Sequence, residues 1–172
     1  MVSCPESEKW FVARVRAGQD LKIRDKLVQL GYRHYIPSKT VLRVRSHRRL
    51  KVESPVVPNL VFLKVSKPTA LSLANGFGLP LSYIVDRKTR TLLVVPEKQM
   101  DDFIRVTEFD PDSLCPPDAE FTVGGRVRVI AGELEGVEGE IIALPTLTYL
   151  LIGISSLLRA KVRIPRSYVE PI

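Results

Sequence analysis

Residues 123–142 read VGGRVRVIAGELEGVEGEII, and this stretch says most about the fold. Apolar and basic residues alternate through residues 126–130, as they do in a strand with one buried face. Glycines follow at Gly132, Gly136 and Gly139, where a tight turn or bulge needs backbone angles that other residues resist. The pattern predicts two short strands that are reversed by a glycine turn.

The residues around this stretch extend it into a small all-β domain. Residues 121–123 and 161–164 also alternate, and short strands with glycine corners within 120–172 indicate a small barrel, which closes its own sheet edges. The run at 149–160 is ambiguous between helix and strand, as short apolar runs are. Gly153 and the β-branched residues near it disfavour a helix, so we predict strands.

A change in composition separates this domain from the rest of the chain. Residues 109–118 are rich in proline and aspartate and show no periodicity, and Pro116-Pro117 restricts the backbone further. We predict an extended acidic linker at 107–119, between a first domain at 8–106 and a second at 120–172. The second domain is near the smallest size that supports an independent core.

The first domain mixes strands and helices. Residues 10–15 are apolar and β-branched, which predicts a strand. Asp20 is the candidate N-cap of a helix that ends near Gly31. The packing stripe of this helix would be Ile23, Leu27 and Leu30.

Further strands and a last helix complete the first domain. Residues 56–65 form a strand region interrupted by Pro58-Asn59, and residues 81–95 resemble a hairpin. Pro96 suits the first turn of a helix. The stripe of that helix would be Met100, Phe103 and Ile104. The order β-α-β-β-β-α predicts an α+β fold, an antiparallel sheet with flanking helices, joined to the all-β barrel.

Residues 41–52 are strongly basic and are predicted to form a β-hairpin. Aliphatic and basic residues alternate from Leu42 to Arg45 and again from Arg49 to Val52, with a turn expected at 46–48. Because side chains alternate across a strand, we expect the aliphatic side chains on one face of the hairpin and the basic ones on the other.

Charge is distributed unevenly along the chain. Residues 1–106 hold 20 lysine and arginine residues and 9 acids, residues 107–119 hold four acids and no base, and residues 120–172 hold six of each. This asymmetry favours contact of the first domain with a polyanion. A basic surface that meets only solvent, or a charged edge that prevents aggregation, is the alternative. The candidate nucleic-acid ligands are Arg14, Arg16, Lys39, Arg43, Arg45, His47, Arg48, Arg49 and Lys51.

No catalytic site, metal site or cofactor is predicted. His34 and His47 have no serine, cysteine or carboxylate set at a spacing that links to them. Cys4 and Cys115 stand alone, which argues against a zinc site and a disulfide framework. Phosphate-binding and dinucleotide-binding glycine motifs do not occur. Four glutamates near the glycine turn are read as a solvated face: Glu133, Glu135, Glu138 and Glu140.

The chain has no apolar run close to the roughly 20 residues that cross a bilayer. Its N-terminus carries acids and lacks the apolar segment of a signal peptide. We therefore expect a cytoplasmic monomer with no membrane partner.

Motifs in both domains resemble those of the NusG family of transcription factors. The glycine-turn stretch at 123–142 resembles the KOW motif, which also occurs in ribosomal proteins. Residues 10–20, followed by Tyr35-Ile36-Pro37, resemble the opening of the NusG N-terminal domain. Residues 56–65 resemble the Pro-Gly-Tyr strand motif of that domain, and residues 95–100 resemble the start of its last helix. The motifs occur in the family's order along nearly the whole chain, and this order makes the resemblance specific.

The resemblance implies a non-enzymatic factor that binds the clamp helices of RNA polymerase and promotes processive elongation or antitermination. Its basic hairpin would lie near upstream or non-template DNA. The polymerase contacts would be Trp10, Val57, Pro58, Asn59 and Leu60; the alternative is that these are core residues of a strand. Asn59 stands where the family has glycine, and asparagine tolerates left-handed backbone geometry.

Departures from the family pattern at Val57, Asn59 and Leu60 favour a specialised, operon-specific paralogue, similar to the regulators of capsular polysaccharide operons in gut anaerobes. The near-neutral KOW domain suits a protein partner, and the family implies a ribosomal protein or Rho. The alternative function is a ribosome- or RNA-associated KOW protein. The basic charge argues against it, because that charge lies outside the KOW domain.

Overall fold

The computed structural model describes residues 6–76, 78–116 and 119–172. Cys4, Pro117 and Asp118, which the sequence interpretation used, lie outside these residues. The chain divides into two compact units, Met1–Glu97 and Lys98–Ile172. Within the described ranges, no helix is long and apolar enough to cross a membrane.

Strand β1 (Lys9–Val15) is at the centre of the sheet in the first unit. It pairs antiparallel with β5 (Leu60–Val65) on one side, and with β6 (Leu81–Tyr83) and β7 (Val94–Val95) on the other. Strand β2 (Arg33–Tyr35) extends the sheet beyond β5. The predicted antiparallel α+β arrangement of this part of the chain is therefore confirmed.

The segment predicted as a hairpin at 81–95 serves mainly to complete this sheet. Its two strands pair with β1, and a single bridge between Val85 and Leu92 joins its arms. Two backbone hydrogen bonds close the turn. The backbone carbonyl of Asp86 accepts the N–H of Arg90, and the N–H of Asp86 donates to the carbonyl of Thr91.

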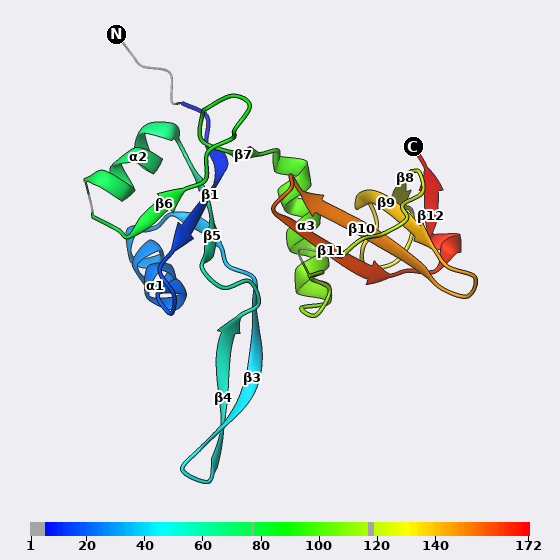
Figure 1. Cartoon of the computed structure of the whole chain (residues 1–172), viewed down its shortest axis with the longest axis horizontal. Helices are drawn as coiled ribbons and strands as arrows, with labels where there is room; N and C mark the ends of the chain where they lie inside the picture. The colour runs from blue at the N-terminus through cyan, green and yellow to red at the C-terminus, as the bar shows by residue number, and fades with distance from the viewer. Residues whose placement is uncertain (1–5, 77, 117–118) are drawn as a thin grey trace. The chain divides into compact units, whose positions relative to one another are not determined.

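Helices α1 (Asp20–Leu30) and α2 (Lys67–Asn75) pack on one face of the sheet (Figure 1). Helix α2 is absent from the predicted order of elements, although Ser66 at its N-cap and Pro68 in its first turn are ordinary start signals. Leu30, predicted to be buried, is exposed. The buried residues of this core are Phe11, Ala13, Val15, Ile23, Leu27, Ile36, Val61, Leu63, Val65, Ala70, Leu73 and Leu79.

The start of α1 differs from the prediction. Gln19 occupies the N-cap position without a side-chain cap, so the prediction that Asp20 caps the helix is wrong. The buried Asp20 carboxylate instead accepts the backbone N–H of Asn59, with an Oδ1–N distance of 2.7 Å. Gly31 ends the helix in the left-handed region, with φ of 76°, as the sequence predicts.

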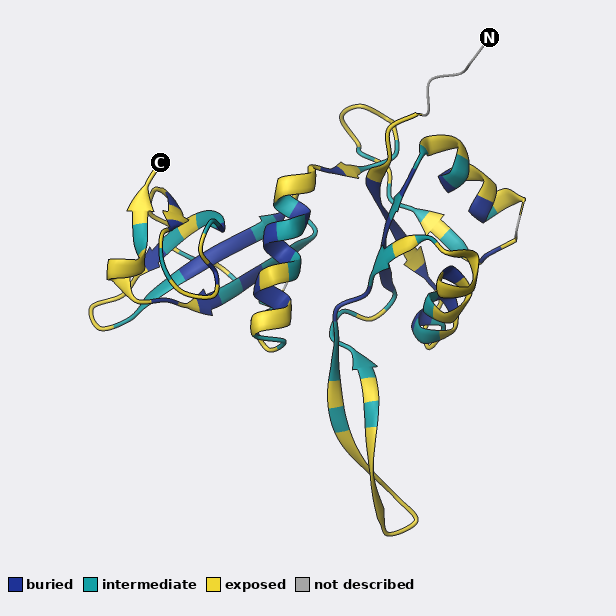
Figure 2. Ribbon diagram, turned by 180° about the vertical axis from the view of Figure 1, so that it is seen from behind, coloured by how far each residue is buried: buried dark blue, intermediate teal, exposed yellow. Residues whose placement is uncertain are grey.

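Strands β3 (Ser38–Arg45) and β4 (Arg48–Pro55) form a two-stranded sheet of their own. This hairpin extends away from the rest of the first unit, and most of its residues are exposed (Figures 1 and 2). The turn consists of Ser46 and His47, with φ of 50° and 65°. Positive φ at both central residues is typical of the type I′ turns that join tight hairpins. The predicted hairpin is confirmed, and it is longer than expected.

The register of the hairpin overturns the predicted separation of its faces. Val44 pairs with Arg49, and Arg43 pairs with Leu50. Residues directly opposite one another share a face, so each face carries aliphatic and basic side chains together. The predicted three-residue turn would have paired Arg45 with Arg49. The two-residue turn pairs it with Arg48, and a shift of one residue moves every side chain of a strand to the other face.

The second unit contains a helix and a five-stranded antiparallel sheet of order β11-β10-β9-β8-β12. Residues 149–160 adopt strands joined by a turn, as predicted. Residues 121–123 do not form the predicted strand. The elements are α3 (Glu97–Phe109), β8 (Arg126–Val129), β9 (Glu138–Ala143), β10 (Thr148–Ile154), β11 (Leu158–Arg163), the 3₁₀ turn η1 (Arg166–Tyr168) and β12 (Val169–Pro171).

Glycines shape the link between β8 and β9, as the sequence predicts. Gly132 and Gly136 both have φ of 86°, which favours glycine, and the N–H of Gly136 donates to the carbonyl of Val129 at 2.8 Å. Gly139 lies so close to β10 that an added Cβ would stand 2.5 Å from the carbonyl oxygen of Leu151.

Helix α3 binds this glycine turn through polar contacts. The Arg105 guanidinium donates to the carbonyls of Glu133 and Glu135, both at 2.8 Å. The buried Asp102 carboxylate accepts the N–H of Glu138 at 3.1 Å. These contacts explain why α3 groups with the C-terminal sheet. Its Met100 and Phe103 are fully buried, as the stripe predicts, whereas Ile104, the third predicted member, is only half-buried and Val106 is buried in its place.

The predicted extended linker is not observed in its described part, which is helical or hydrogen-bonded to the second unit. Residues 107–109 complete α3, the carbonyl of Ser113 accepts the N–H of Lys161 at 2.7 Å, and Cys115 donates its N–H to the carbonyl of Arg159 at 2.9 Å. The compact units therefore divide after Glu97. The bounds 8–106, 107–119 and 120–172 remain a prediction for the domains.

Candidate functional site

The hairpin concentrates the exposed basic residues of the first unit. Within the described parts of the chain, none of its five arginine and lysine residues beyond residue 40 has a carboxylate at ion-pair distance. Lys39 is half-buried near the base, and His47 is exposed in the turn. The five cations are Arg43, Arg45, Arg48, Arg49 and Lys51.

A cluster of polar side chains holds the base of the hairpin against α1. Glu53 of β4 accepts the hydroxyl of Ser38 at 2.6 Å and the Arg24 guanidinium at 2.5 Å. The hydrogen bond from Ser38, with that from Arg24, lowers the pKa of Glu53, and the bond to Glu53 raises the pKa of Arg24. The N–H of Val56 donates to the carbonyl of Pro37 at 2.7 Å and closes the base. These contacts fix where the hairpin leaves the unit.

Arg24 and Glu53 are contributors that the sequence interpretation missed. They stand 29 residues apart, and nothing in their local pattern links them. Asp20 was missed in the same way, because its partner Asn59 lies 39 residues further along the chain.

The two remaining basic candidates lie elsewhere. Arg14 is exposed on β1 opposite Leu60, and Arg16 is exposed just beyond the end of that strand. The N–H of Val15 donates to the carbonyl of Asn59 at 3.0 Å. Both arginines therefore belong to the surroundings of the 56–59 turn and not to the hairpin strands.

The apolar candidates centre on that turn. Asn59 has φ of 65°, the left-handed geometry that asparagine tolerates. Its N–H is held by the Asp20 carboxylate. Val57 and Asn59 are half-buried and Pro58 is exposed. The 56–59 turn thus offers a small, rigid, mostly apolar surface.

Trp10 and Leu60 are buried, with exposed fractions of 2% and 6%. They lie on the sheet face opposite the α1 and α2 core, at different ends of the β1–β5 pair: Trp10 is opposite Lys64, and Leu60 is opposite Arg14. The Arg33 guanidinium lies 5.4 Å from the centre of the Trp10 ring. The indole N–H of Trp10 has no acceptor among the residues that the structure describes.

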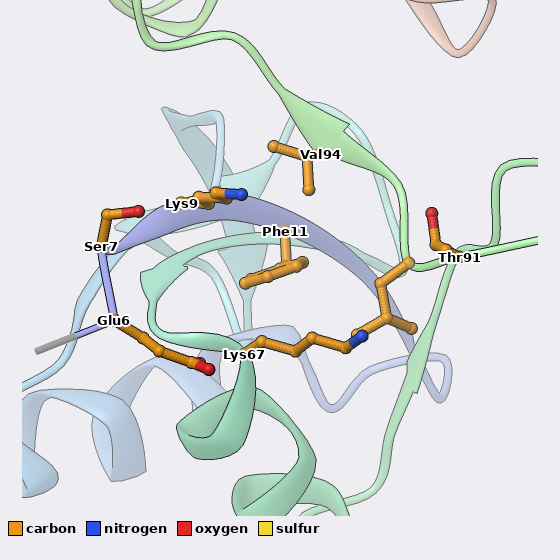
Figure 3. A pocket seen from close by; sticks show the side chains of 8 residues that line it. Glu6, Ser7, Lys9, Phe11, Lys67, Thr91 and Val94 are labelled. Atoms are coloured by element: carbon orange, nitrogen blue, oxygen red, sulfur yellow. The ribbon is translucent and has the colours of Figure 1, made fainter. Parts of the chain in front are cut away.

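A cavity of about 520 Å³ in the first unit lies beside β1 and the start of α2 (Figure 3). Phe11, Lys9 and Lys67 line it together with Thr91 and Val94. Glu6 and Ser7 line it too. Within the described residues, no hydrogen bond or ion pair joins the Glu6 carboxylate, the Ser7 hydroxyl and the two ammonium groups into a catalytic set.

The glutamates of the second unit do not assemble into a ligand set. Glu138 accepts hydrogen bonds from the Arg128 guanidinium, which lower its pKa, and Arg126 lies 3.5 Å away. Glu133, Glu135 and Glu140 are exposed. In the ranges 6–76, 78–116 and 119–172, no three His, Cys, Asp or Glu side chains come together in a way that could hold a metal ion.

Comparison with known proteins gives one family. The model of the family described as "Transcription termination factor nusG" matches residues 8–104, more than half of the chain. NusG of Thermotoga maritima, solved for its domain interaction, is similar at 20% identity with a TM-score of 0.49, over 96% of this chain and 97% of that chain. A crystal structure of an MjSpt4:Spt5 complex is similar at 11% identity with a TM-score of 0.30, over 95% and 97%. Comparison with curated proteins found no match.

Proposed function

Because this chain belongs to the NusG family of non-enzymatic transcription factors, we propose that it acts on transcription elongation in the cytoplasm by binding RNA polymerase. We propose further that it binds the clamp helices and promotes processive elongation or antitermination, with its hairpin on upstream or non-template DNA. The observation that carries the DNA contact is the exposed hairpin, which extends from a fixed base and whose five cations have no carboxylate partner in the described parts of the chain.

The charge of the hairpin supports contact with phosphates. Cations that replace condensed counterions on DNA gain affinity that falls steeply with salt, with a slope of about −0.9 per phosphate neutralised on a duplex. The five hairpin cations have no competing carboxylate within the described residues, so each is available for such a contact. Phosphate contacts position a protein and carry no base preference. Recruitment to particular operons would need further contacts to bases.

The apolar turn supports a protein contact. Pro58 is exposed, and the hydrogen bond from Asn59 to Asp20 holds the turn in place. Trp10 and Leu60 are too deeply buried to meet polymerase directly, so in this proposal the contact is made by Val57, Pro58 and Asn59.

The C-terminal sheet, in our proposal, is a KOW-type barrel that docks a protein, with a ribosomal protein or Rho as the candidates. A cavity of about 320 Å³ in this unit is lined by Phe109, Leu134, Ile164 and Tyr168, among others, and suits an apolar side chain of a partner. The cations of this unit are largely engaged: Arg128 binds Glu138, and Arg159 and Lys161 lie over the ring of Phe121. This engagement disfavours the alternative of an RNA-associated KOW protein.

Single-round transcription by bacterial RNA polymerase tests the proposal, on a template with pauses and terminators and on the operon leader that accompanies this gene. Pause lifetime or read-through should change when the protein is added. The change should be lost in Pro58→Glu, which places a charge on an exposed position of the turn without disturbing the core. Lys22→Glu, on the exposed side of α1, is the control and should retain it. No change on either template would refute the proposal.

A further inference from the structure

The register of the hairpin divides its cations unequally between its two faces. The first face consists of residues 39, 41, 43 and 45 with their partners 54, 52, 50 and 48, and it carries four basic side chains and no acid. The second face consists of residues 38, 40, 42 and 44 with partners 55, 53, 51 and 49, and it carries two basic side chains and Glu53. We call them the guanidinium face and the mixed face.

Three guanidinium groups of the guanidinium face gather at its exposed end. Arg45 and Arg48 stand directly opposite each other beside the turn, and Arg43 is two residues from Arg45 along β3. Opposed side chains have Cβ atoms about 5 Å apart, and neighbours along one face of a strand are about 7 Å apart. Like charges directly opposite each other destabilise a hairpin. An anion between Arg45 and Arg48 would remove that repulsion, and guanidinium groups bind phosphate with two hydrogen bonds each.

At the same distance from the base, the mixed face carries exposed aliphatic side chains beside its two cations. Leu42 and Val44 are 64% and 73% exposed, and they stand opposite Lys51 and Arg49. Large exposed aliphatic side chains gain nothing from a charged, hydrated phosphate backbone. The guanidinium face exposes one of them, Leu50 at 47%, against two on the mixed face. Near the base, the Glu53 carboxylate would repel the same backbone. The mixed face is therefore the less favourable side for DNA.

We propose that the hairpin binds DNA phosphates with its guanidinium face alone, through Arg43, Arg45 and Arg48, and that the Arg45–Arg48 pair holds one phosphate between its two strands. This proposal rests on the proposed DNA contact of the hairpin and adds which side of it meets the backbone. Leu50 lies on the same face, so in this arrangement it would stand beside the DNA backbone.

Two double variants with equal loss of charge test the proposal. Arg45→Gln with Arg48→Gln removes two cations from the guanidinium face, and Arg49→Gln with Lys51→Gln removes two from the mixed face. Affinity of the full chain is measured by fluorescence anisotropy over a range of salt, with a fluorescein-labelled DNA duplex and with a labelled single strand. Hydrogen exchange of the hairpin amides shows whether each variant keeps its strands.

The guanidinium-face variant should bind at least about tenfold more weakly at low salt, and its salt slope should fall by about 1–2, the value for one or two lost phosphates. The mixed-face variant should change affinity by less than about threefold, the part due to net charge alone. The variant Arg45→Lys with Arg48→Lys keeps the charge and should keep most of the slope, with weaker binding because ammonium groups lack the two-point geometry.

Equal weakening by the two double variants, or a larger effect of the mixed-face variant, would overturn the assignment of faces and leave the DNA contact standing. Unchanged affinity in both would remove the DNA contact of the hairpin itself. The duplex and single-strand probes show which form of DNA the guanidinium face prefers.

Discussion

Replacement of Asp20 by alanine should destabilise the first unit and release the 56–59 turn. Asp20 is 3% exposed, and its carboxylate accepts the Asn59 N–H at 2.7 Å. The same carboxylate stands in the first turn of α1, where the helix dipole favours a negative charge. One side chain therefore holds the turn that we propose to contact polymerase, and its charge also favours the first turn of a helix.

The expected cost follows from these two roles. A hydrogen bond to a charged group contributes about 1.5–3 kcal/mol, and a carboxylate at a helix N-terminus about 0.3–1 kcal/mol. Asp20→Ala should therefore lower the free energy of unfolding of the first unit by about 2–4 kcal/mol. Asp20→Asn keeps an acceptor oxygen and loses the charge, so it should cost roughly half as much.

Urea denaturation gives the loss of stability, and hydrogen exchange of the Asn59 amide gives the local effect. In Asp20→Ala that amide should lose its protection. Asp25→Ala is the control, because Asp25 is an exposed acid of the same helix whose ion pair with Arg24 spans 3.3 Å at the surface. It should change stability by less than about 0.5 kcal/mol. An Asp20→Ala protein as stable as the control variant would show that the hydrogen bond makes no net contribution.

Three further predictions follow from other parts of the structure. Gly139→Ala should cost about 1–3 kcal/mol or prevent folding of the C-terminal sheet, because its Cβ would meet a backbone carbonyl oxygen of β10. Gly125→Ala is the control: it has open space around it and should be nearly neutral in thermal denaturation. The folded-state pKa of Glu53 is lowered, so its contribution is complete above its ordinary pKa of about 4.3 and disappears as the pH falls through the lower value. The pair of Glu53 with Arg24 is partly exposed, so wild type and Glu53→Gln should differ in stability by less than about 1 kcal/mol at pH 7. This difference should vanish in acid. A difference that grows in acid would contradict the cause given for the lowered pKa of Glu53. Burial raises the pKa of Tyr83 to about 12, and its buried hydroxyl has no partner within the described residues. Tyr83→Phe should therefore raise the melting temperature by the equivalent of about 1 kcal/mol, and a lower melting temperature would indicate a partner for that hydroxyl.

Local patterns predicted the elements whose signals lie close together in the sequence. The β1 strand, the helix that ends at Gly31, the basic hairpin and the strands of residues 149–160 all follow from periodicity and glycine position. The left-handed backbone at Asn59 was also predictable, because few other residues adopt it readily.

The wrong predictions concern features that a short window of sequence does not determine. A turn of two residues and a turn of three differ by one residue of register, which moves the side chains of one strand to the other face relative to its partner. Ser46-His47 is not one of the Asn-Gly or Asp-Gly pairs that signal a two-residue type I′ turn. The roles of Asp20 and Glu53 depend on partners far along the chain. The grouping of α3 with the C-terminal sheet depends on contacts such as those of Arg105, which no periodicity reveals.

The central claim is that the hairpin reaches DNA when the protein is bound to transcribing RNA polymerase. Site-specific photo-crosslinking tests it most directly, with the photoreactive amino acid placed at Leu50 of the hairpin or at Val28, an exposed position of α1. Elongation complexes assembled with labelled DNA are irradiated, and adducts are mapped to the upstream or non-template strand. The account predicts DNA adducts from position 50 and none from position 28. A complex that carries the protein yet gives no adduct from position 50, or equal adducts from both positions, would contradict it.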